Sequence, residues 1–110
     1  MTDRLIWERD GGDWPNRAHS RFVTTAGRQW HVQRFGNGPQ MLLVHGTGAS
    51  THSWRHLMPL LADRFDVCAI DLPGHGFTDA LPAAAMTVPG MAHALHGVLR
   101  EIGFVPRVIA

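Results

Sequence analysis

Two short, wholly apolar runs, each followed at once by a glycine-bearing loop, constrain the fold of this chain most. Met41–Val44 leads into the loop His45–Gly48, and Val67–Ile70 leads into the loop Asp71–Gly76. Apolar runs of this length are typical of strands that are buried on both faces of a parallel sheet. In open α/β sheets, ligands bind beyond the carboxyl ends of the strands. The pattern therefore predicts that both loops lie on the functional edge of such a sheet.

The residues before the first apolar run are predicted to form an antiparallel hairpin. Residues 20–25 and 29–35 alternate between apolar and polar side chains, as strands do. Residues 26–28 provide the turn between them, and the loop 36–39, with two glycines and a proline, ends the hairpin.

Two amphipathic helices are predicted to join the apolar strands. The first carries its apolar stripe at Trp54, Leu57, Met58 and Leu61. Pro59 is tolerated in its first turns if the regular helix begins near Arg55. The second begins after Thr87 as N-cap and ends at Gly103. Its apolar stripe is Val88, Met91, Leu95, Val98, Leu99 and Ile102. With a third apolar run at 107–110, the order predicts an α/β fold in which right-handed crossovers join parallel strands.

The chain divides into an N-terminal arm, residues 1–17, and an α/β portion, residues 18–110. The arm is polar and rich in turn-forming residues, so we expect it to be irregular. It contains two tryptophans, Trp7 and Trp14. We expect these rings to dock on parts of the fold that lie outside this chain.

Charge and cysteine content exclude several classes of protein. Ten arginines and no lysine balance nine acidic residues, for a net charge of +1, so the basic patch of a nucleic-acid-binding protein is not expected. The single cysteine, Cys68, has no partner for a disulfide within the chain, which indicates a reducing compartment and, by default, the cytoplasm. No apolar run has the length of a membrane span or the character of a signal peptide. We expect a soluble protein.

The two loops differ in the chemistry that they can support. Gly46, Thr47 and Gly48 permit a tight turn, and backbone amides in such turns hold the oxyanion in acyl-transfer enzymes. The alternative is a strand-to-helix turn in which glycine serves geometry alone. The second loop lacks the GxGxxG dinucleotide motif because Asp79 occupies its last position. For that loop a rigid turn that supports its neighbour is favoured.

No metal site and no cofactor are expected. Two histidine pairs have the spacing that places both rings on one helix face: His52 with His56, and His93 with His96. Neither pair belongs to an HExxH motif, and a third ligand is not evident. Surface or capping roles are favoured for these rings, a capping role for Ser50 and inert packing for Cys68.

The two loops and their flanking strands resemble the first third of the α/β-hydrolase fold. The segments that carry the resemblance are Leu42–Gly48, Trp54 and Asp71–Thr78. The resemblance implies that Thr47, preceded by Gly46, supplies one amide of the oxyanion hole. It implies structural roles in the two loops for His45, Gly48, Asp71, Gly74 and Gly76.

A narrower resemblance runs over nearly the whole chain, the arm included. Residues 13–17, 30–33, 46–54 and 74–78 resemble the magnesium-chelatase accessory proteins of bacteriochlorophyll biosynthesis. This resemblance implies a role in magnesium insertion into protoporphyrin IX. It further implies a porphyrin or an ester as small-molecule substrate and magnesium chelatase as a partner.

The chain departs from the family because it lacks the reaction centre. The family's nucleophile lies in a G-x-S-x-G elbow after the fifth strand, and no such motif occurs here. We therefore expect an N-terminal fragment, cut before the elbow, that has no catalytic residue and no activity of its own. Two alternatives for the parent stay open: a Ser-His-Asp carboxylic-ester hydrolase, and a porphyrin-binding protein without turnover.

Overall fold

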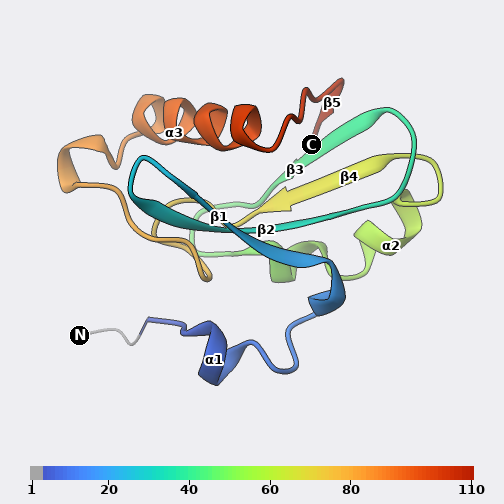
Figure 1. The fold of residues 1–110 in the computed structure, drawn as a ribbon, viewed down its shortest axis with the longest axis horizontal. Coiled ribbons are helices and arrows are strands. Elements are labelled where there is room, and N and C mark those ends of the chain that lie inside the picture. The colour runs from blue at the N-terminus through green and yellow to red at the C-terminus, as the bar shows by residue number, and fades with distance from the viewer. Residues whose placement is uncertain (1–3) are drawn as a thin grey trace.

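A five-stranded mixed sheet forms the centre of the computed structural model, which describes residues 4–110 (Figure 1). The strands are β1 (Ser20–Thr25), β2 (Arg28–Phe35), β3 (Gln40–Val44), β4 (Asp66–Ile70) and β5 (Val108–Ile109). The helices are α1 (Trp7–Asp10), α2 (Leu57–Leu61) and α3 (Val88–Glu101), and short 3-10 turns are η1 (Arg17–His19), η2 (Thr51–Trp54) and η3 (Ala83–Ala85). The predicted α/β class is confirmed.

The spatial order of the strands is β1-β2-β4-β3-β5. β3 runs parallel to both of its neighbours, β4 and β5, whereas β2 runs antiparallel to β1 and to β4. The predicted hairpin is confirmed, and its two-residue turn has positive φ at Ala26 (52°) and Gly27 (75°). Such turns match the right-handed twist of the two strands that they join.

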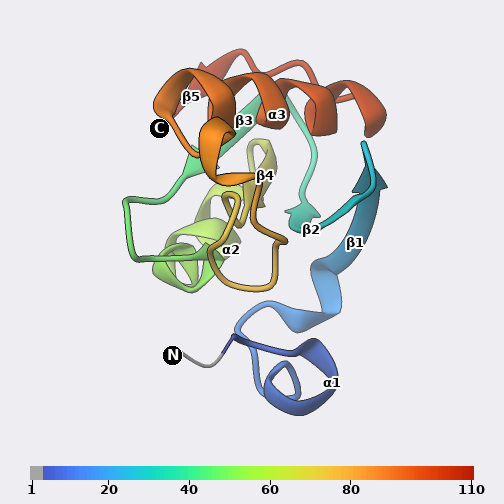
Figure 2. The same ribbon diagram turned by 90° about the vertical axis from the view of Figure 1, so that its left-hand side faces the viewer.

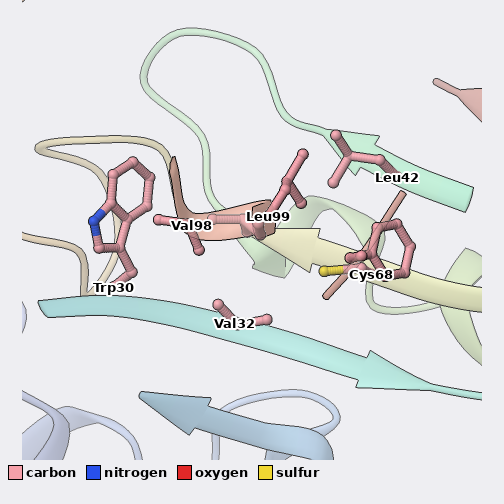
Figure 3. Close-up of a cluster of buried hydrophobic side chains, with 8 residues drawn as sticks. Trp30, Val32, Leu42, Cys68, Val98 and Leu99 are labelled. Carbon is pink, nitrogen blue, oxygen red and sulfur yellow. The ribbon is translucent and has the colours of Figure 1, made fainter. Parts of the chain in front are cut away.

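Helices cover both faces of the sheet (Figures 1 and 2). α3 lies on one face, where Val98 and Leu99 pack against β-strand side chains such as those of Trp30 and Val32 (Figure 3). α2 lies on the other face and buries Met58 completely. That second cluster comprises Met41, Leu43, Met58, Val67 and Ala69. Alternation along β3 and β4 therefore divides their side chains between two cores, as expected for strands buried on both faces.

The second helix agrees with its predicted ends. The Thr87 hydroxyl accepts a hydrogen bond from the Gly90 N–H at 3.1 Å, which caps the first turn of α3. Gly103 has φ 67°, and the Phe104 N–H donates to the Leu99 carbonyl at 2.9 Å, as in a glycine-terminated helix. One residue of the predicted stripe is wrong: Val88, in the first turn, is 78% exposed.

The first helix is shorter than predicted. Regular α-helix begins at Leu57 rather than near Arg55, because the preceding residues form the 3-10 turn η2. Ser50 caps that turn by accepting a hydrogen bond from the His52 N–H at 3.2 Å, so its predicted capping role is confirmed. Leu57, predicted to face the core, is 41% exposed.

The arm is more ordered than predicted, and it docks on this chain. It contains the helical turn α1, and a hydrogen bond from the Ile6 N–H to the Asp10 carboxylate (2.8 Å) ties the two ends of that turn together. Trp7 and Trp14 pack against Phe77, with ring centroids 5.0 and 4.7 Å away. The expectation that these tryptophans need further parts of the fold was therefore wrong.

Cys68 lies in the core between β2 and β3, as its predicted packing role requires (Figure 3). Burial raises the pKa of its thiol to about 12. Because the thiolate is the reactive form, we expect a thiol-specific disulfide reagent at mildly alkaline pH to leave the folded protein unlabelled. One equivalent should react after denaturant is added. Labelling of the native chain at the rate of a free thiol would contradict the burial of Cys68.

Candidate active site at the carboxyl edge of the sheet

The two glycine-bearing loops lie together, as the sequence predicts. His45 joins them, because its Nε2 accepts a hydrogen bond from the Leu72 N–H at 2.9 Å. Its Nδ1 lies 2.7 Å from the Gly46 carbonyl oxygen, to which it donates. A ring that accepts at one nitrogen and donates at the other is the neutral tautomer. His45 thus links the two loops by hydrogen bonds. The centroid of the His75 ring lies 5.0 Å from that of the His45 ring.

A cavity of about 310 Å³ lies beside His45. Its walls come from the end of β3 and the first loop (Val44, His45, Gly46, Thr47), from the second loop (Leu72, His75) and from α3 (Val88, Met91, Ala92, Leu95). The walls are mostly apolar, with two imidazole rings and exposed backbone at one side. Pockets of this character hold small molecules.

The first loop lines this cavity with Gly46 and Thr47, both of which are exposed. Gly48 has φ 80°, and the Ala49 N–H donates to the Gly46 carbonyl at 3.1 Å, which closes a tight turn. Thr47 is exposed at the tip of this turn. Within residues 4–110 its amide makes no hydrogen bond. A free, exposed N–H beside a cavity can donate to a negatively charged oxygen of a ligand.

The second loop is organised around the Asp71 carboxylate, which is fully buried. One oxygen accepts from the Thr51 N–H at 2.7 Å, and the other accepts from the Phe77 N–H at 3.0 Å and from His31 Nδ1 at 2.7 Å. Burial by itself would raise the pKa of Asp71, but the His31 ring and the two amides outweigh it and hold the pKa below its ordinary value. Asp71 is therefore an ionised carboxylate that ties the second loop to Thr51, the first residue of η2.

Glycine is required next to this carboxylate. Gly76 has φ 51°, and a Cβ at this position would overlap the Asp71 carboxylate. Gly74 has φ 76° and donates its N–H to the Asp79 carbonyl at 3.3 Å. Asp71, Gly74 and Gly76 thus belong to one hydrogen-bonded turn, and their predicted supporting role stays a prediction.

His31 is the residue at this edge that the sequence analysis missed. Its ring is fully buried, with Nδ1 on Asp71 and Nε2 2.8 Å from the Ser20 hydroxyl, which also accepts from Gln33 Nε2 at 3.0 Å. The signal for it was available: His31 and Gln33 are polar and lie on the face of β2 opposite Trp30. A polar strand face that an arm with two tryptophans covers indicates a buried hydrogen-bond network.

Ser20, His31 and Asp71 are hydrogen-bonded in the order of a catalytic triad. Unlike a catalytic triad, however, this series is closed to substrate. The His31 and Asp71 side chains have no exposed surface. Four aromatic rings, those of Trp7, Trp14, Phe22 and Phe77, lie within 6.5 Å of the His31 ring centroid. A substrate cannot reach the imidazole, so this network is structural.

The remaining predicted features give no metal centre. The His52 ring packs against Trp14 and lies within hydrogen-bond distance of the Arg55 guanidinium, at 3.2 Å. His93 and His96 are exposed on α3. Residues 4–110 contain no group of three or more His, Cys, Asp or Glu side chains placed to hold an ion. In the same residues, no helix combines the length and apolarity needed to cross a bilayer.

Comparison with known proteins places these features in a wider group. The sequence profile of the alpha/beta hydrolase fold matches residues 39–109. The chain is 32% identical over 99 residues to the magnesium-chelatase 30 kDa subunit of Rhodobacter capsulatus. This match covers 88% of this chain and 35% of that protein. It is 36% identical over 70 residues to the pimeloyl-[acyl-carrier protein] methyl ester esterase of Aeromonas hydrophila, or 64% of this chain and 28% of the esterase.

A solved structure extends the likeness to three dimensions. An alpha/beta hydrolase fold protein from Burkholderia ambifaria superimposes with a TM-score of 0.71 at 32% identity, over 80% of this chain and 33% of that one. The chain therefore spans between 20% and 35% of the length of the curated relatives that it matches.

Proposed function

Because the chain belongs to the α/β-hydrolase fold family, we propose that the whole protein binds a small molecule at the carboxyl edge of the sheet and assists magnesium chelatase. The pocket between the two loops and α3 is the proposed binding site. Gly46 and Thr47 are the proposed half of an oxyanion hole, with the Thr47 amide as donor. The ligand class is a porphyrin or an ester.

The observation that carries the chelatase role is the extent of one similarity. The match to the magnesium-chelatase 30 kDa subunit covers 88% of this chain, so it includes part of the segment before residue 39, where the match to the general hydrolase family begins. That segment supplies the arm, and Trp14 of the arm bonds to Thr51, three residues after the first loop. The longer match, 88% of this chain against 64% for the methyl ester esterase, supports the chelatase role over that of a general esterase. We propose that the protein serves bacteriochlorophyll biosynthesis and photosynthesis, and the lone, buried Cys68 favours the cytoplasm as its location.

A second candidate function is ester hydrolysis without any chelatase. It is favoured by the exposed Thr47 amide, which has no hydrogen-bond partner among residues 4–110, and by the similarity to a methyl ester esterase over 70 residues. Acyl transfer needs such a donor because charge develops on the carbonyl oxygen in the transition state. It also needs a nucleophile, which the whole protein would have to supply.

Titration of protoporphyrin IX into the whole protein tests the proposal. We expect a saturable change in the porphyrin absorption band. Ala92→Trp should abolish it, because Ala92 is an exposed wall residue and the larger ring would fill the cavity. Ala84→Trp is the matched control, since Ala84 is exposed in η3 and is not a wall residue of this cavity.

Two results decide between the functions, and a third tests the expected inactivity of the 110-residue chain. Binding that Ala92→Trp removes and Ala84→Trp keeps supports the proposed site. No porphyrin binding, together with saturable hydrolysis of methyl or p-nitrophenyl esters by the whole protein, favours the esterase. Hydrolysis of p-nitrophenyl esters by the 110-residue chain itself would contradict the expectation that it has no activity alone.

A further inference from the structure

The first loop is held at both ends and free in its middle. At its start, His45 is tied to Leu72 of the second loop. Three residues beyond its end, Thr51 is buried, and its N–H donates to Asp71 at 2.7 Å. Between these two points Gly46–Gly48 are exposed. The position of the free amides therefore depends on the two attachment points.

The arm holds the second attachment point from the outside. Trp14 Nε1 donates to the Thr51 hydroxyl at 3.0 Å, at the first residue of η2. Asn16 Nδ2 donates to the Arg55 carbonyl at 3.3 Å, at the residue that directly follows η2. Two residues of the arm, separated by Pro15 alone, thus contact the two ends of the turn that follows the loop.

The arm is itself fixed to the sheet. Gln33 of β2, which is fully buried, donates its Nε2 to the Pro15 carbonyl at 2.7 Å. The Trp14 ring packs edge-on against Phe77 of the second loop and lies 5.3 Å from the His52 ring. A rigid ring anchored on a strand is well suited to hold a loop, since its own geometry is already determined.

From these contacts we infer that Trp14 is a positioning residue of the pocket, acting through Thr51 on the loop Gly46–Gly48. The inference rests on the proposed function, because the loop matters only if the pocket binds a ligand. The arm would then help to shape the site, although none of its residues lines the cavity.

Amide hydrogen exchange tests the inference on the chain itself. Trp14→Phe keeps an aromatic ring against Phe77 and removes the N–H donor, and Thr51→Val removes the acceptor at nearly constant volume. Each should speed exchange at the Ala49, Thr51 and Leu72 amides about fivefold, the factor expected from one neutral hydrogen bond. The Ile102 amide of the α3 end, which bonds to Val98, should exchange as in the wild type.

Three further variants separate positioning from general destabilisation. The double variant should match either single one, because both remove the same bond. Thr51→Ser keeps a hydroxyl and should restore slow exchange. Trp7→Phe makes the same change in the same arm at an indole that forms no hydrogen bond within residues 4–110, and should leave the loop amides unchanged. Equal acceleration at Ile102 and at the loop, or no acceleration in Trp14→Phe, would overturn the inference.

Kinetics of the whole protein keep this inference distinct from the proposed function. If the whole protein hydrolyses esters, Trp14→Phe should lower kcat roughly tenfold with KM unchanged, since a displaced oxyanion donor acts on the transition state alone. An equal loss in kcat for Trp7→Phe would contradict a specific role for Trp14. If the whole protein proves to have no ligand, the exchange pattern still decides whether Trp14 holds the loop.

Discussion

Replacing Asp71 by alanine is expected to lower the free energy of unfolding by about 3–5 kcal/mol, the range found when one partner of a buried ion pair or network is removed. The carboxylate accepts hydrogen bonds from His31, Thr51 and Phe77, and all three donors are buried around it. Without the carboxylate these donors lose their acceptor, and each buried unpaired group costs about 1–3 kcal/mol. Urea unfolding followed by tryptophan fluorescence measures the difference.

Asp63→Ala is the matched control for this variant. Asp63 is exposed, and its carboxylate makes no hydrogen bond or ion pair in the part of the chain that the structure describes. Removal of an exposed, unpaired carboxylate should change stability by less than about 0.5 kcal/mol. If Asp71→Ala were as mild as Asp63→Ala, the buried network would not stabilise the fold.

The same carboxylate gives the stability of the protein a defined pH dependence. Because folding lowers the pKa of Asp71, its contribution is fully present above the pKa of an unfolded aspartate, about 3.9. It is lost as the pH falls through the lower pKa of the folded state. The stability difference between wild type and Asp71→Ala should be constant near neutral pH and should shrink below about pH 4. A difference that grew on acidification would contradict the ionised state assigned to Asp71.

Replacing Gly76 by alanine is expected to cost about 3 kcal/mol or more. Part of the cost is the positive φ of 51°, which side chains other than glycine rarely adopt. The larger part is the overlap of the new Cβ with the Asp71 carboxylate, which would have to move away from its donors. Thermal or urea unfolding measures the loss.

Gly97→Ala provides a control with the opposite sign. Gly97 lies inside α3, has no positive φ, and a Cβ there would meet no atom within 4 Å. Alanine should therefore stabilise the helix by about 0.5–1 kcal/mol. A Gly76→Ala protein as stable as Gly97→Ala would show that the second loop can relax, and that Asp71 does not fix it.

The strands and the meeting of the two loops could be predicted because their signals are local. Met41–Val44 and Val67–Ile70 are apolar without interruption, and the structure extends each strand by one residue at its start. The parallel order then places both following loops at one edge. The end of α3 was equally predictable, since Gly103 has the positive φ that a glycine-terminated helix needs.

The rest depends on contacts that a single sequence does not display. The bond between His31 and Asp71 requires β2 to run antiparallel to β4, with Val32 opposite Ile70. Periodicity finds each of these strands but gives neither their pairing nor their register. The arm was misjudged for the same reason: its polar residues indicate a loop, and only the positions of Phe77 and Thr51 in space show what its tryptophans contact.

The antiparallel direction of β2 also determines which loops lie at the carboxyl edge of the sheet, next to the pocket. In a uniformly parallel sheet, only segments that follow strands would lie at this edge. Here the hairpin turn at Ala26-Gly27, which precedes β2, lies at the same edge. Close to this turn, the Gln29 N–H donates a hydrogen bond to the Asp79 carboxylate at 2.8 Å. Extra residues in a surface turn cost little free energy. Lengthening this hairpin tip would thus be an inexpensive way for a related sequence to acquire a cover over this edge while every strand stays as it is.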